Sequence, residues 1–417
     1  MSEARSRWSE WVEATAVGVE AAGQWRVPRT FDARGTTGVL AGTEGEVVSF
    51  ASNDYLGLAS HPAVIGAAHA ALDRWGAGSG GSRLITGSRP IHDSLEAALA
   101  EWKNCERAVV FPTGFAANLS VLSVFGANGA RIFSDELNHA SIIDGCRLAR
   151  ASATVFPHGD LVALDALVAD SPERAVIVSD TVFSMDGDEA DLAGLVDLAG
   201  RHHALLVLDE AHAVLGPDLP EGAMDQVDVL RVGTLSKTLG ALGGFVAGPG
   251  LWVELLVNLA RPYIFTTAPT PAAAAAALAA LAVVQSAEGD DLRARLGAFV
   301  ARIAPDPGHR SPIVPVVIGG EEDTIAASSS LQSQGLWVPA IRPPTVPAGT
   351  SRLRVTLSAA HTDEQVDRLA DGLAGLLRGE QASGREMDQR NGPDKEQRNG
   401  PENEQGRRST EPDVLAS

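Results

Sequence analysis

Lys237, in the stretch TLSKTLG at residues 234–240, is one of only three lysines in the chain. The other two are Lys103, in the polar helical stretch EWKNCER, and Lys395, in a C-terminal segment with almost no apolar residues. Lys237 follows an apolar run that is typical of a buried strand, where a lysine is uncommon because desolvation penalises its charge. Taken alone, such a lysine is more simply explained as exposed at the surface.

Further apolar runs end in polar residues that could act together with Lys237. These residues are Asp209 and His212 in ALLVLDEAH, Asp180 and Ser184 in SDTVFSMDGD, Thr113 and Gly114 in FPTGFAANL, and His139 in SDELNHASIIDG. Each has an ordinary explanation when considered singly. An isolated Asp at a strand end more often caps the next helix, and a lone His in a loop is more often a cap or a packed ring.

Taken together, these residues are the groups that pyridoxal 5'-phosphate requires: a lysine for a Schiff base, a carboxylate for the pyridinium nitrogen and donors for the phosphate. Asp209 is the expected carboxylate, because a nearby negative charge keeps the ring nitrogen protonated. The helix that begins after Thr113 has free N–H groups for the phosphate, and His139 is a candidate to stack on the ring. The positions of Lys103 and Lys395 leave Lys237 as the only plausible Schiff-base lysine.

The elements that must position these residues form an α/β pattern. Seven short runs rich in Val, Ile and Leu alternate with helical segments: RAVVFPTG, ARIFSDE, SATVFPHG, RAVIVSD, ALLVLDE, DVLRVGTLS and GGFVAGPG. Near-continuous apolar strands separated by helices indicate a mostly parallel sheet that is covered on both faces. Ligands of such sheets bind beyond the carboxyl ends of the strands, where the polar residues above are found.

The chain divides into four predicted regions. Residues 1–45 are expected to pack with a small lobe, residues 46–288 to form a large cofactor-binding domain, and residues 289–378 to form a smaller α/β domain. Residues 379–417 contain QRNGP twice and too few apolar side chains to offset the entropy of ordering, so we predict a disordered tail.

Composition excludes several classes of function. A formal net charge of −20 argues against a nucleic-acid surface, which needs clustered Lys and Arg. No apolar run is long enough to suggest a membrane span, and the N-terminus lacks the order of a signal peptide. Two cysteines without metal-ligand spacing predict neither a disulfide framework nor a metal site. We therefore expect a soluble cytoplasmic protein with no nucleic-acid or membrane partner.

The motifs resemble those of the α-oxoamine synthases, which are fold-type I pyridoxal-phosphate enzymes. The resemblance covers residues 20–378, and eight motifs follow the family's order: SNDYLGL, GAGSGGSRLITG, HDSLE, FPTGFAAN, NHAS, FSMDGD, DEAH and TLSKTLG. It implies a seven-stranded, mostly parallel sheet in a large domain, a smaller C-terminal α/β domain, and a homodimer with active sites at the subunit interface.

The resemblance also assigns roles to individual residues. It makes Lys237, Asp209 and His139 catalytic, as Schiff-base lysine, pyridinium partner and stacking ring. It implies further cofactor-binding positions at Gly114, Phe115, Ser184, His212 and Thr234, and at Thr266 or Thr267 reaching the partner's phosphate. It implies substrate-binding positions at His139, Asn53, Thr345 and Arg354, with Arg354 for the substrate carboxylate. Arg26, in a loosely aligned region, is the candidate N-terminal substrate-binding arginine.

The segment AIRPPTVPAGTSRLRVTLSAAH resembles the members that serve biotin synthesis. The implied reaction is a decarboxylative condensation of L-alanine with a pimeloyl thioester, carried on coenzyme A or acyl carrier protein. The alternatives are glycine C-acetyltransferase, 5-aminolevulinate synthase and a non-catalytic partner subunit, although intact Lys237, Asp209 and His139 argue against the last. Asp180, where many members carry Glu, and Ala213, where DEAHG is usual, leave the local loop geometry open.

Overall fold

The computed structural model describes residues 6–171 and 174–390, with side chains as far as residue 376. One compact unit ends at Gly372, and a second begins at Leu373. All the residues predicted to take part in chemistry belong to the first unit, which contains every strand in the described part of the chain.

A seven-stranded sheet forms the centre of this unit, as the sequence predicts. Its strands lie in the order β4-β10-β9-β8-β7-β5-β6, and all neighbours are parallel except those of β10. The bounds are β4 Arg107–Phe111, β5 Ala130–Asp135, β6 Ser152–Phe156, β7 Arg174–Asp180, β8 Leu205–Asp209, β9 Val229–Thr234 and β10 Gly244–Gly248. Each of the seven apolar runs has therefore become one strand, which confirms the predicted fold class.

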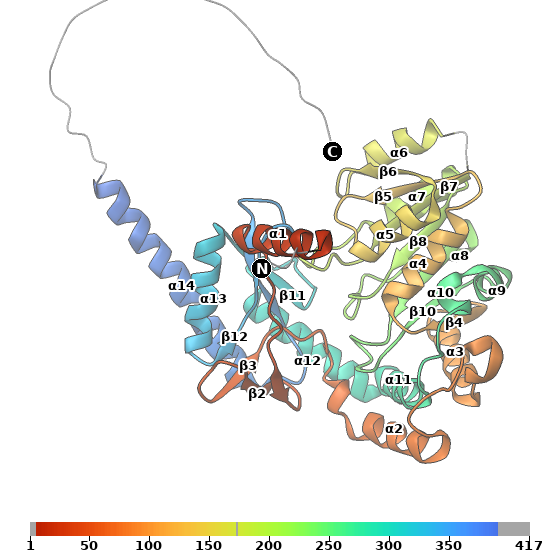
Figure 1. Ribbon diagram of the computed structural model, residues 1–417, viewed down its shortest axis with the longest axis horizontal. Coiled ribbons are helices and arrows are strands. Elements are labelled where there is room, and N and C mark those ends of the chain that lie inside the picture. Colours follow the sequence, from red (N-terminus) through yellow and green to blue (C-terminus); the bar gives the residue numbers. More distant parts are fainter. Residues whose placement is uncertain (1–5, 172–173, 391–417) are drawn as a thin grey trace, which may run out of the picture. The chain divides into compact units, whose positions relative to one another are not determined.

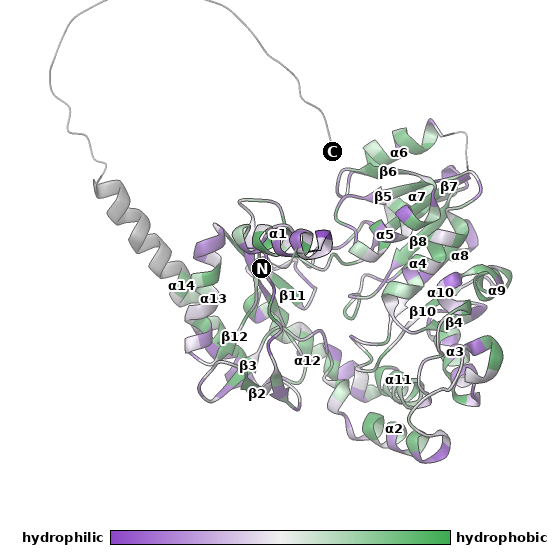
Figure 2. Ribbon diagram, viewed as in Figure 1, coloured by the Kyte–Doolittle hydropathy of each residue, from purple (hydrophilic) through white to green (hydrophobic). Residues whose placement is uncertain are grey.

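Helices cover both faces of this sheet (Figure 1). Residues of α4 (Gly114–Phe125), α5 (Ala140–Ala149), α9 (Gly250–Leu259) and α10 (Arg261–Ile264) share one apolar cluster with one face. Residues of α6 (Leu161–Ala169), α7 (Leu192–Arg201) and α8 (Ala223–Gln226) share another with the opposite face. In β8, Leu205 and Val207 enter the first cluster, whereas Leu206 and Leu208 enter the second, as alternation along a strand requires. Figure 2 shows the resulting hydrophobic interior.

Two smaller sheets lie outside the central one. The first has the order β1-β2-β3-β12, with β1 Phe31–Ala33, β2 Thr37–Leu40, β3 Glu46–Ser49 and β12 Leu336–Trp337. The second has the order β11-β14-β13, with β11 Ile313–Gly319, β13 Ala340–Ile341 and β14 Ser351–Thr356. The parallel pairing of β12 with β3 joins the N-terminal segment to the 289–378 region. Residues 46–49, which the sequence placed in the large domain, therefore belong to the N-terminal sheet.

The remaining long helices are α1 (Arg7–Ala21), α2 (Pro62–Trp75), α3 (Pro90–Trp102), α11 (Pro271–Val284), α12 (Ala287–Ile303), α13 (Glu321–Ser333) and α14 (Asp363–Arg390). Within the described ranges no single helix is long and apolar enough to cross a membrane. The pair α11 and α12 reaches the required length and composition only jointly, with a bend of 78° between them. In the first unit, α11 buries residues such as Ala277, Ala280 and Leu281 in the core.

Helix α14 continues to Arg390, past the predicted start of the tail at Gly379. That predicted boundary is therefore too early for the helix, because no proline interrupts the chain between Asp363 and Pro393. The rest of the predicted tail, residues 391–417, lies outside the described residues.

Candidate active site

A cavity of about 200 Å³ opens where β7, β8 and β9 end and where α4 and α5 begin. The side chains around it come from segments far apart in the sequence. They are Thr113, Gly114, Phe115, Asn118, His139, Ser141, Asp180, Asp209, Ala211, His212, Thr234, Ser236 and Lys237. The carboxyl ends of the parallel strands thus bring together most of the residues that the sequence singled out.

Lys237 and His212 form one wall of this cavity. The Lys237 Nζ lies 2.7 Å from Nε2 of His212, which is buried. Burial lowers the pKa of Lys237, although the carboxylates of Asp209 and Asp180 act in the opposite direction. Burial also holds the pKa of His212 well below its usual value, and the positive charge of Lys237 adds to this effect. A neutral imidazole therefore faces an amine that loses its proton more readily than an exposed lysine.

Asp209 ends β8 and lines the cavity. Its Oδ1 accepts a hydrogen bond from the Ala211 N–H at 2.9 Å, and its Oδ2 accepts one from Asn118 Nδ2 at 2.6 Å. Asn118 is buried in α4 and also donates to the Ser141 hydroxyl at 2.9 Å. Neutral donors thus orient the Asp209 carboxylate, so it can act as the negative partner of a cationic ring nitrogen.

His139 reaches the cavity from the first turn of α5, where it also caps the helix. Its Nδ1 lies 2.7 Å from the Ser141 hydroxyl, and its main-chain N–H donates to Asp180 Oδ2 at 2.7 Å. Partial burial lowers the pKa of His139, and Lys237 adds to this while Asp209 opposes it. Asp180 is buried beneath it, and burial together with the nearby Asp209 raises the pKa of Asp180 well above its usual value. Asp180 therefore fixes the main chain at His139.

The first turn of α4 provides a site for an anion. Thr113 caps the helix through its hydroxyl, which accepts from the Ala116 N–H at 3.0 Å. A Cβ at Gly114 would lie 3.3 Å from Cβ of Thr234, so glycine permits this close approach of α4 to the end of β9. The helix N-terminus and the hydroxyls of Thr234 and Ser236, 2.8 Å apart, suit a phosphate group.

Arg354, on β14, is buried and does not line the cavity, but its charge acts on both Lys237 and His212. Its guanidinium donates to Asn53 Oδ1 at 3.3 and 3.4 Å, to Thr356 Oγ1 at 2.9 Å and to the Ser184 carbonyl at 2.5 Å. Burial lowers the pKa of Arg354 from its ordinary value, but arginine remains charged. Ser184 thus contacts Arg354 through its main chain, and its side chain does not line the cavity.

Seven predicted residues are absent from the lining of this cavity: Arg354, Asn53 and Ser184, described above, and four that lie elsewhere. Arg26 lies in the exposed segment between α1 and β1, and Thr345 lies in the exposed loop before β14. Thr266 and Thr267 follow α10 and are absent from the lining of the cavity of their own chain. Their roles toward substrate or a second subunit stay predictions.

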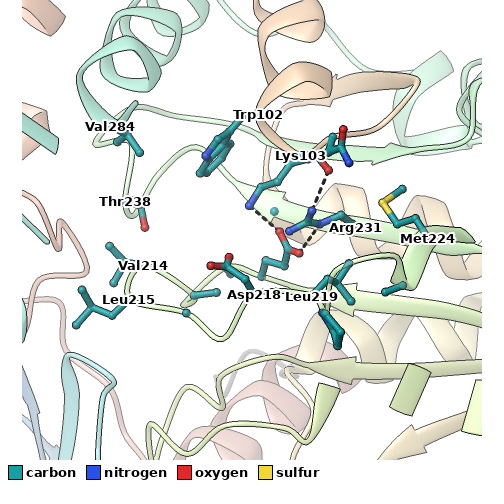
Figure 3. Close-up of a pocket in the computed structure, with 18 of the residues that line it drawn as sticks. Trp102, Lys103, Val214, Leu215, Asp218, Leu219, Met224, Arg231, Thr238 and Val284 are labelled. Carbon is teal, nitrogen blue, oxygen red and sulfur yellow. Dashed lines mark hydrogen bonds and ion pairs between the residues drawn. The ribbon is translucent and has the colours of Figure 1, made fainter. Parts of the chain in front are cut away.

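A larger cavity of about 1050 Å³ shares Ala211 and Thr234 in its lining with the smaller one. Figure 3 shows Trp102, Lys103 and Arg231 in this larger cavity. Lys103 and Arg231 converge there on the buried Glu210, with N–O distances of 2.7 and 2.6 Å. The Lys103 ammonium also lies 3.8 Å from the centre of the Trp102 ring. Lys103 therefore forms a buried ion pair and does not line the smaller cavity. Ala213, the second departure from the family motif, lines the larger cavity.

The residues of the smaller cavity fit pyridoxal phosphate. They include one lysine, one strand-end carboxylate, a histidine ring and a helix N-terminus, and the buried Asn118 Oδ1 has no hydrogen-bond partner among the described residues. In the described part of the chain, no group of three or more His, Cys, Asp and Glu side chains is arranged to hold a metal ion.

Sequence reasoning missed two buried residues of this region. Asn118 joins Asp209 to Ser141, and Tyr55 contacts the far side of His212. Both residues lie inside motifs of the resemblance, Tyr55 in SNDYLGL and Asn118 in FPTGFAAN, but neither was assigned a role. The further signal for Asn118 is a polar residue within the apolar helix FAANLSVLSVF, whereas a tyrosine in a core is common.

Comparisons with known proteins show which family this chain resembles. The family model "Aminotransferase class I and II" matches residues 45–373. An 8-amino-7-oxononanoate synthase of Burkholderia thailandensis is 51% identical over 349 residues, which is 79% of this chain and 88% of the relative. One of Burkholderia mallei is 49% identical over 348 residues, with 78% and 88% covered.

Solved structures with similar folds include a serine palmitoyltransferase from S. paucimobilis with bound PLP. Its TM-score is 0.82 at 29% identity, and the match covers 90% of this chain and 99% of that one. An 8-amino-7-oxononanoate synthase from Francisella tularensis has a TM-score of 0.67 at 26% identity, covering 80% of this chain and 98% of that one.

Proposed function

Because this chain belongs to the class I and II aminotransferase family, and within it to the α-oxoamine synthases, we propose that it carries out the reaction of an 8-amino-7-oxononanoate synthase. That reaction joins L-alanine to a pimeloyl thioester and yields 8-amino-7-oxononanoate, carbon dioxide and the free thiol carrier, a step of biotin synthesis. The identity of 49–51% to synthases of this name supports the choice among family members.

One observation carries the proposal: a single cavity contains Lys237, whose amine lies 2.7 Å from His212, together with Asp209 and His139. When bound, pyridoxal phosphate supplies an electron sink for the electrons left at Cα of the amino acid. Lys237 would hold its aldehyde carbon, Asp209 its ring nitrogen, and His139 one face of its ring. The first turn of α4 and Thr234 would hold its phosphate.

The lowered pKa of Lys237 suits the proposed role of its amine as a general acid and base. Burial disfavours the ammonium form, so an amine freed from the cofactor can accept the Cα proton of alanine and later return one. His212, kept neutral by burial and by the neighbouring Lys237 charge, accepts a hydrogen bond from this amine and does not repel it.

The carboxylate of alanine needs a cationic partner beside the same cavity. Arg354 and Asn53 provide a charge and an amide there, held by β14 and by the turn before Tyr55. Bidentate donation by an arginine fixes a carboxylate in one orientation. Thr345 and Arg26 are proposed to complete substrate binding around the pimeloyl chain.

We further propose that two copies assemble, with Thr266 or Thr267 of one chain near the phosphate site of the other. Exposed apolar side chains at Leu84, Ile85 and Phe265 support this assembly. The Ala268 N–H donates to the Gly81 carbonyl at 3.0 Å, so these side chains belong to neighbouring segments. A cytoplasmic site of action is proposed from the two free cysteines, Cys105 and Cys146.

A substrate panel tests the proposed reaction. The purified protein would be incubated with alanine, glycine or serine against acetyl, succinyl, pimeloyl and palmitoyl thioesters, with the pimeloyl group on coenzyme A or acyl carrier protein. Mass spectrometry should detect 8-amino-7-oxononanoate from alanine and a pimeloyl donor, and none with a Lys237→Ala control. A ketone formed only from glycine or serine would instead assign the activity of another α-oxoamine synthase.

A further inference from the structure

Tyr55 lies at the centre of a hydrogen-bonded chain that ends at Lys237. It sits in the turn between β3 and the short helix Leu58–Ser60, and its side chain is 0% exposed. Its hydroxyl lies 2.5 Å from Nδ1 of His212 and 3.2 Å from Oδ1 of Asn53. Nε2 of the same His212 lies 2.7 Å from the Lys237 amine.

The donors along this chain can be assigned from chemistry. Burial and the adjacent Lys237 and Arg354 charges lower the pKa of His212 well below its usual value, so the ring is neutral and carries one proton. The Lys237 amine, when protonated, can only donate, so Nε2 of His212 accepts from it. Nδ1 of His212 then carries the proton and donates to the Tyr55 oxygen.

The Tyr55 hydroxyl continues this chain of hydrogen bonds in the same direction. Burial raises the pKa of Tyr55, although Arg354, which contacts the same hydroxyl, opposes this. The phenol keeps its proton, and its O–H donates a hydrogen bond to Asn53 Oδ1. Asn53 Oδ1 also accepts from Arg354. Each of the three hydrogen bonds that join Lys237, His212, Tyr55 and Asn53 thus has one donor and one acceptor, and the chain ends on the Asn53 Oδ1, which cannot donate.

We propose that Tyr55 is a positioning residue for the reactive lysine, because its hydroxyl holds His212 in the Nδ1–H tautomer that leaves Nε2 free to accept from Lys237. A phenylalanine would fill the same space but leave the buried Nδ1–H without an acceptor. The ring of His212 would then take the other tautomer and present a donor to Lys237. Only an effect of Tyr55 on turnover rests on the proposed function. The tautomer of His212 and the reactivity of the Lys237 amine do not depend on that function.

The first test uses the reaction of the cofactor-stripped, full-length protein with pyridoxal phosphate. The rate of covalent attachment to Lys237 is measured against pH by absorbance, with borohydride trapping and peptide mapping to confirm the site. In Tyr55→Phe the midpoint should move to lower pH, because the acceptor that stabilises the lysine ammonium is lost, and the plateau rate should fall at least tenfold. An unchanged midpoint and plateau would overturn the proposal.

The matched control is Tyr263→Phe, which removes the same hydroxyl from the only other tyrosine, also a buried one. It should keep the wild-type midpoint and plateau; an equal loss in both variants would show a general effect of removing a buried hydroxyl and would refute the specific role. His212→Asn and the double variant that combines it with Tyr55→Phe complete a double-mutant cycle. If Tyr55 acts through His212, the double variant is no slower than His212→Asn alone, whereas additive losses contradict the proposal.

A second measurement needs no Tyr55 variant and stands if that variant fails to fold. Nitrogen chemical shifts of ¹⁵N-histidine-labelled protein without cofactor report the tautomer of each ring, and the His212→Asn spectrum identifies the signals of His212. The Nδ1–H tautomer is expected, and an Nε2–H tautomer would overturn the proposal. If the wild-type protein joins no amino acid to any thioester, the proposed function fails, while the attachment rate and the tautomer still decide the role of Tyr55.

Discussion

Lys237 and Lys103 show how surroundings give two lysines of one chain different chemistry. Lys237 borders the smaller cavity and contacts a neutral imidazole, which leaves its amine free to react. Lys103 is paired with Glu210 at 2.7 Å inside the wall of the other cavity. Breaking a buried ion pair costs several kcal/mol, typically about 3–5, so Lys103 is not available as a substitute.

Lys237→Ala should therefore abolish covalent capture of pyridoxal phosphate. We expect the purified wild-type protein to be yellow and to carry the borohydride-reduced cofactor on the peptide that contains Lys237. The variant should show no reduced adduct on any lysine. Peptide mapping by mass spectrometry checks this, and an adduct on Lys103 in the variant would contradict the assignment.

Asp209→Asn should retain the fold and bind the cofactor but lose most of the condensation activity. Asparagine can still accept from Asn118 or the Ala211 N–H, but it supplies no negative charge to keep a ring nitrogen protonated. Each unit by which the pKa of that nitrogen falls corresponds to about 1.4 kcal/mol. Steady-state turnover with alanine and the absorbance of bound cofactor test this together. Near-wild-type turnover would reduce Asp209 to a structural role.

The sequence predicted three polar side chains that meet at the smaller cavity better than it predicted the residues that contact them. Lys237, Asp209 and His139 each follow an apolar run, and parallel strands bring such positions to one edge. Tyr55 and Asn118 act through contacts with residues more than 90 positions away, at His212 and Asp209. Such pairings depend on tertiary packing and carry no local pattern, so neither residue was among the predicted site residues.

At the scale of elements, His158 joins the end of β5 to the loop that carries Ser184. Its ring lies between Asp135, which ends β5, and Asp188, with distances of 2.9 and 2.7 Å, and its edge packs on Phe183. The same loop contacts β14 through an ion pair between Asp186 and Arg352. Partial burial opposes a charge on His158, but the hydrogen bonds and charges of Asp135 and Asp188 outweigh it and raise its pKa.

This raised pKa predicts a pH dependence of stability. From about pH 6.5, the ordinary value for histidine, up to the raised folded pKa, the folded chain holds a proton that the unfolded chain has released. The contribution of His158 is thus complete below about pH 6.5 and lost as the pH rises through its folded pKa. Urea unfolding of wild type and His158→Asn between pH 6 and 9 should show a flatter pH slope in the variant.

His69→Asn, on the exposed surface of α2, is the matched control and should keep the wild-type slope. Equal slopes in wild type and His158→Asn would mean that the ring stays neutral between the two carboxylates. The contact itself was not predictable, because Asp135 and Asp188 lie on opposite sides of His158 in the sequence and meet only when β5 and the 183–188 loop are in place.

Apolar runs in the sequence predicted the strands of the central sheet but not those of the N-terminal sheet. All seven strands of the central sheet were predicted, since buried parallel strands form continuous apolar segments. Strands β1, β2 and β3 were not predicted individually. They are three or four residues long and partly exposed, so they show neither a continuous run nor a long alternation.

At the scale of the whole molecule, we expect that C-terminal residues can be removed without loss of stability or activity. The first compact unit ends at Gly372 and contains every residue of both cavities. From Gly379 onward the sequence has six basic and nine acidic residues, a net charge of −3, and few apolar side chains that could bind by burial. A surface ion pair between this segment and the rest of the chain contributes less than about 1 kcal/mol.

A chain truncated after Arg378 should therefore keep the melting temperature and the alanine-dependent activity of the full-length protein. Truncation after Thr362 is the matched control, because it removes the start of α14 with the fully buried Val366 and Leu369. Those two side chains contribute about 1.5–3 kcal/mol each, so the shorter protein should melt well below wild type. Turnover on pimeloyl groups carried by coenzyme A and by acyl carrier protein is measured for all three proteins. A drop of several degrees after removal of residues 379–417, or selective loss of one donor, would show that the removed segment contacts the enzyme or its carrier.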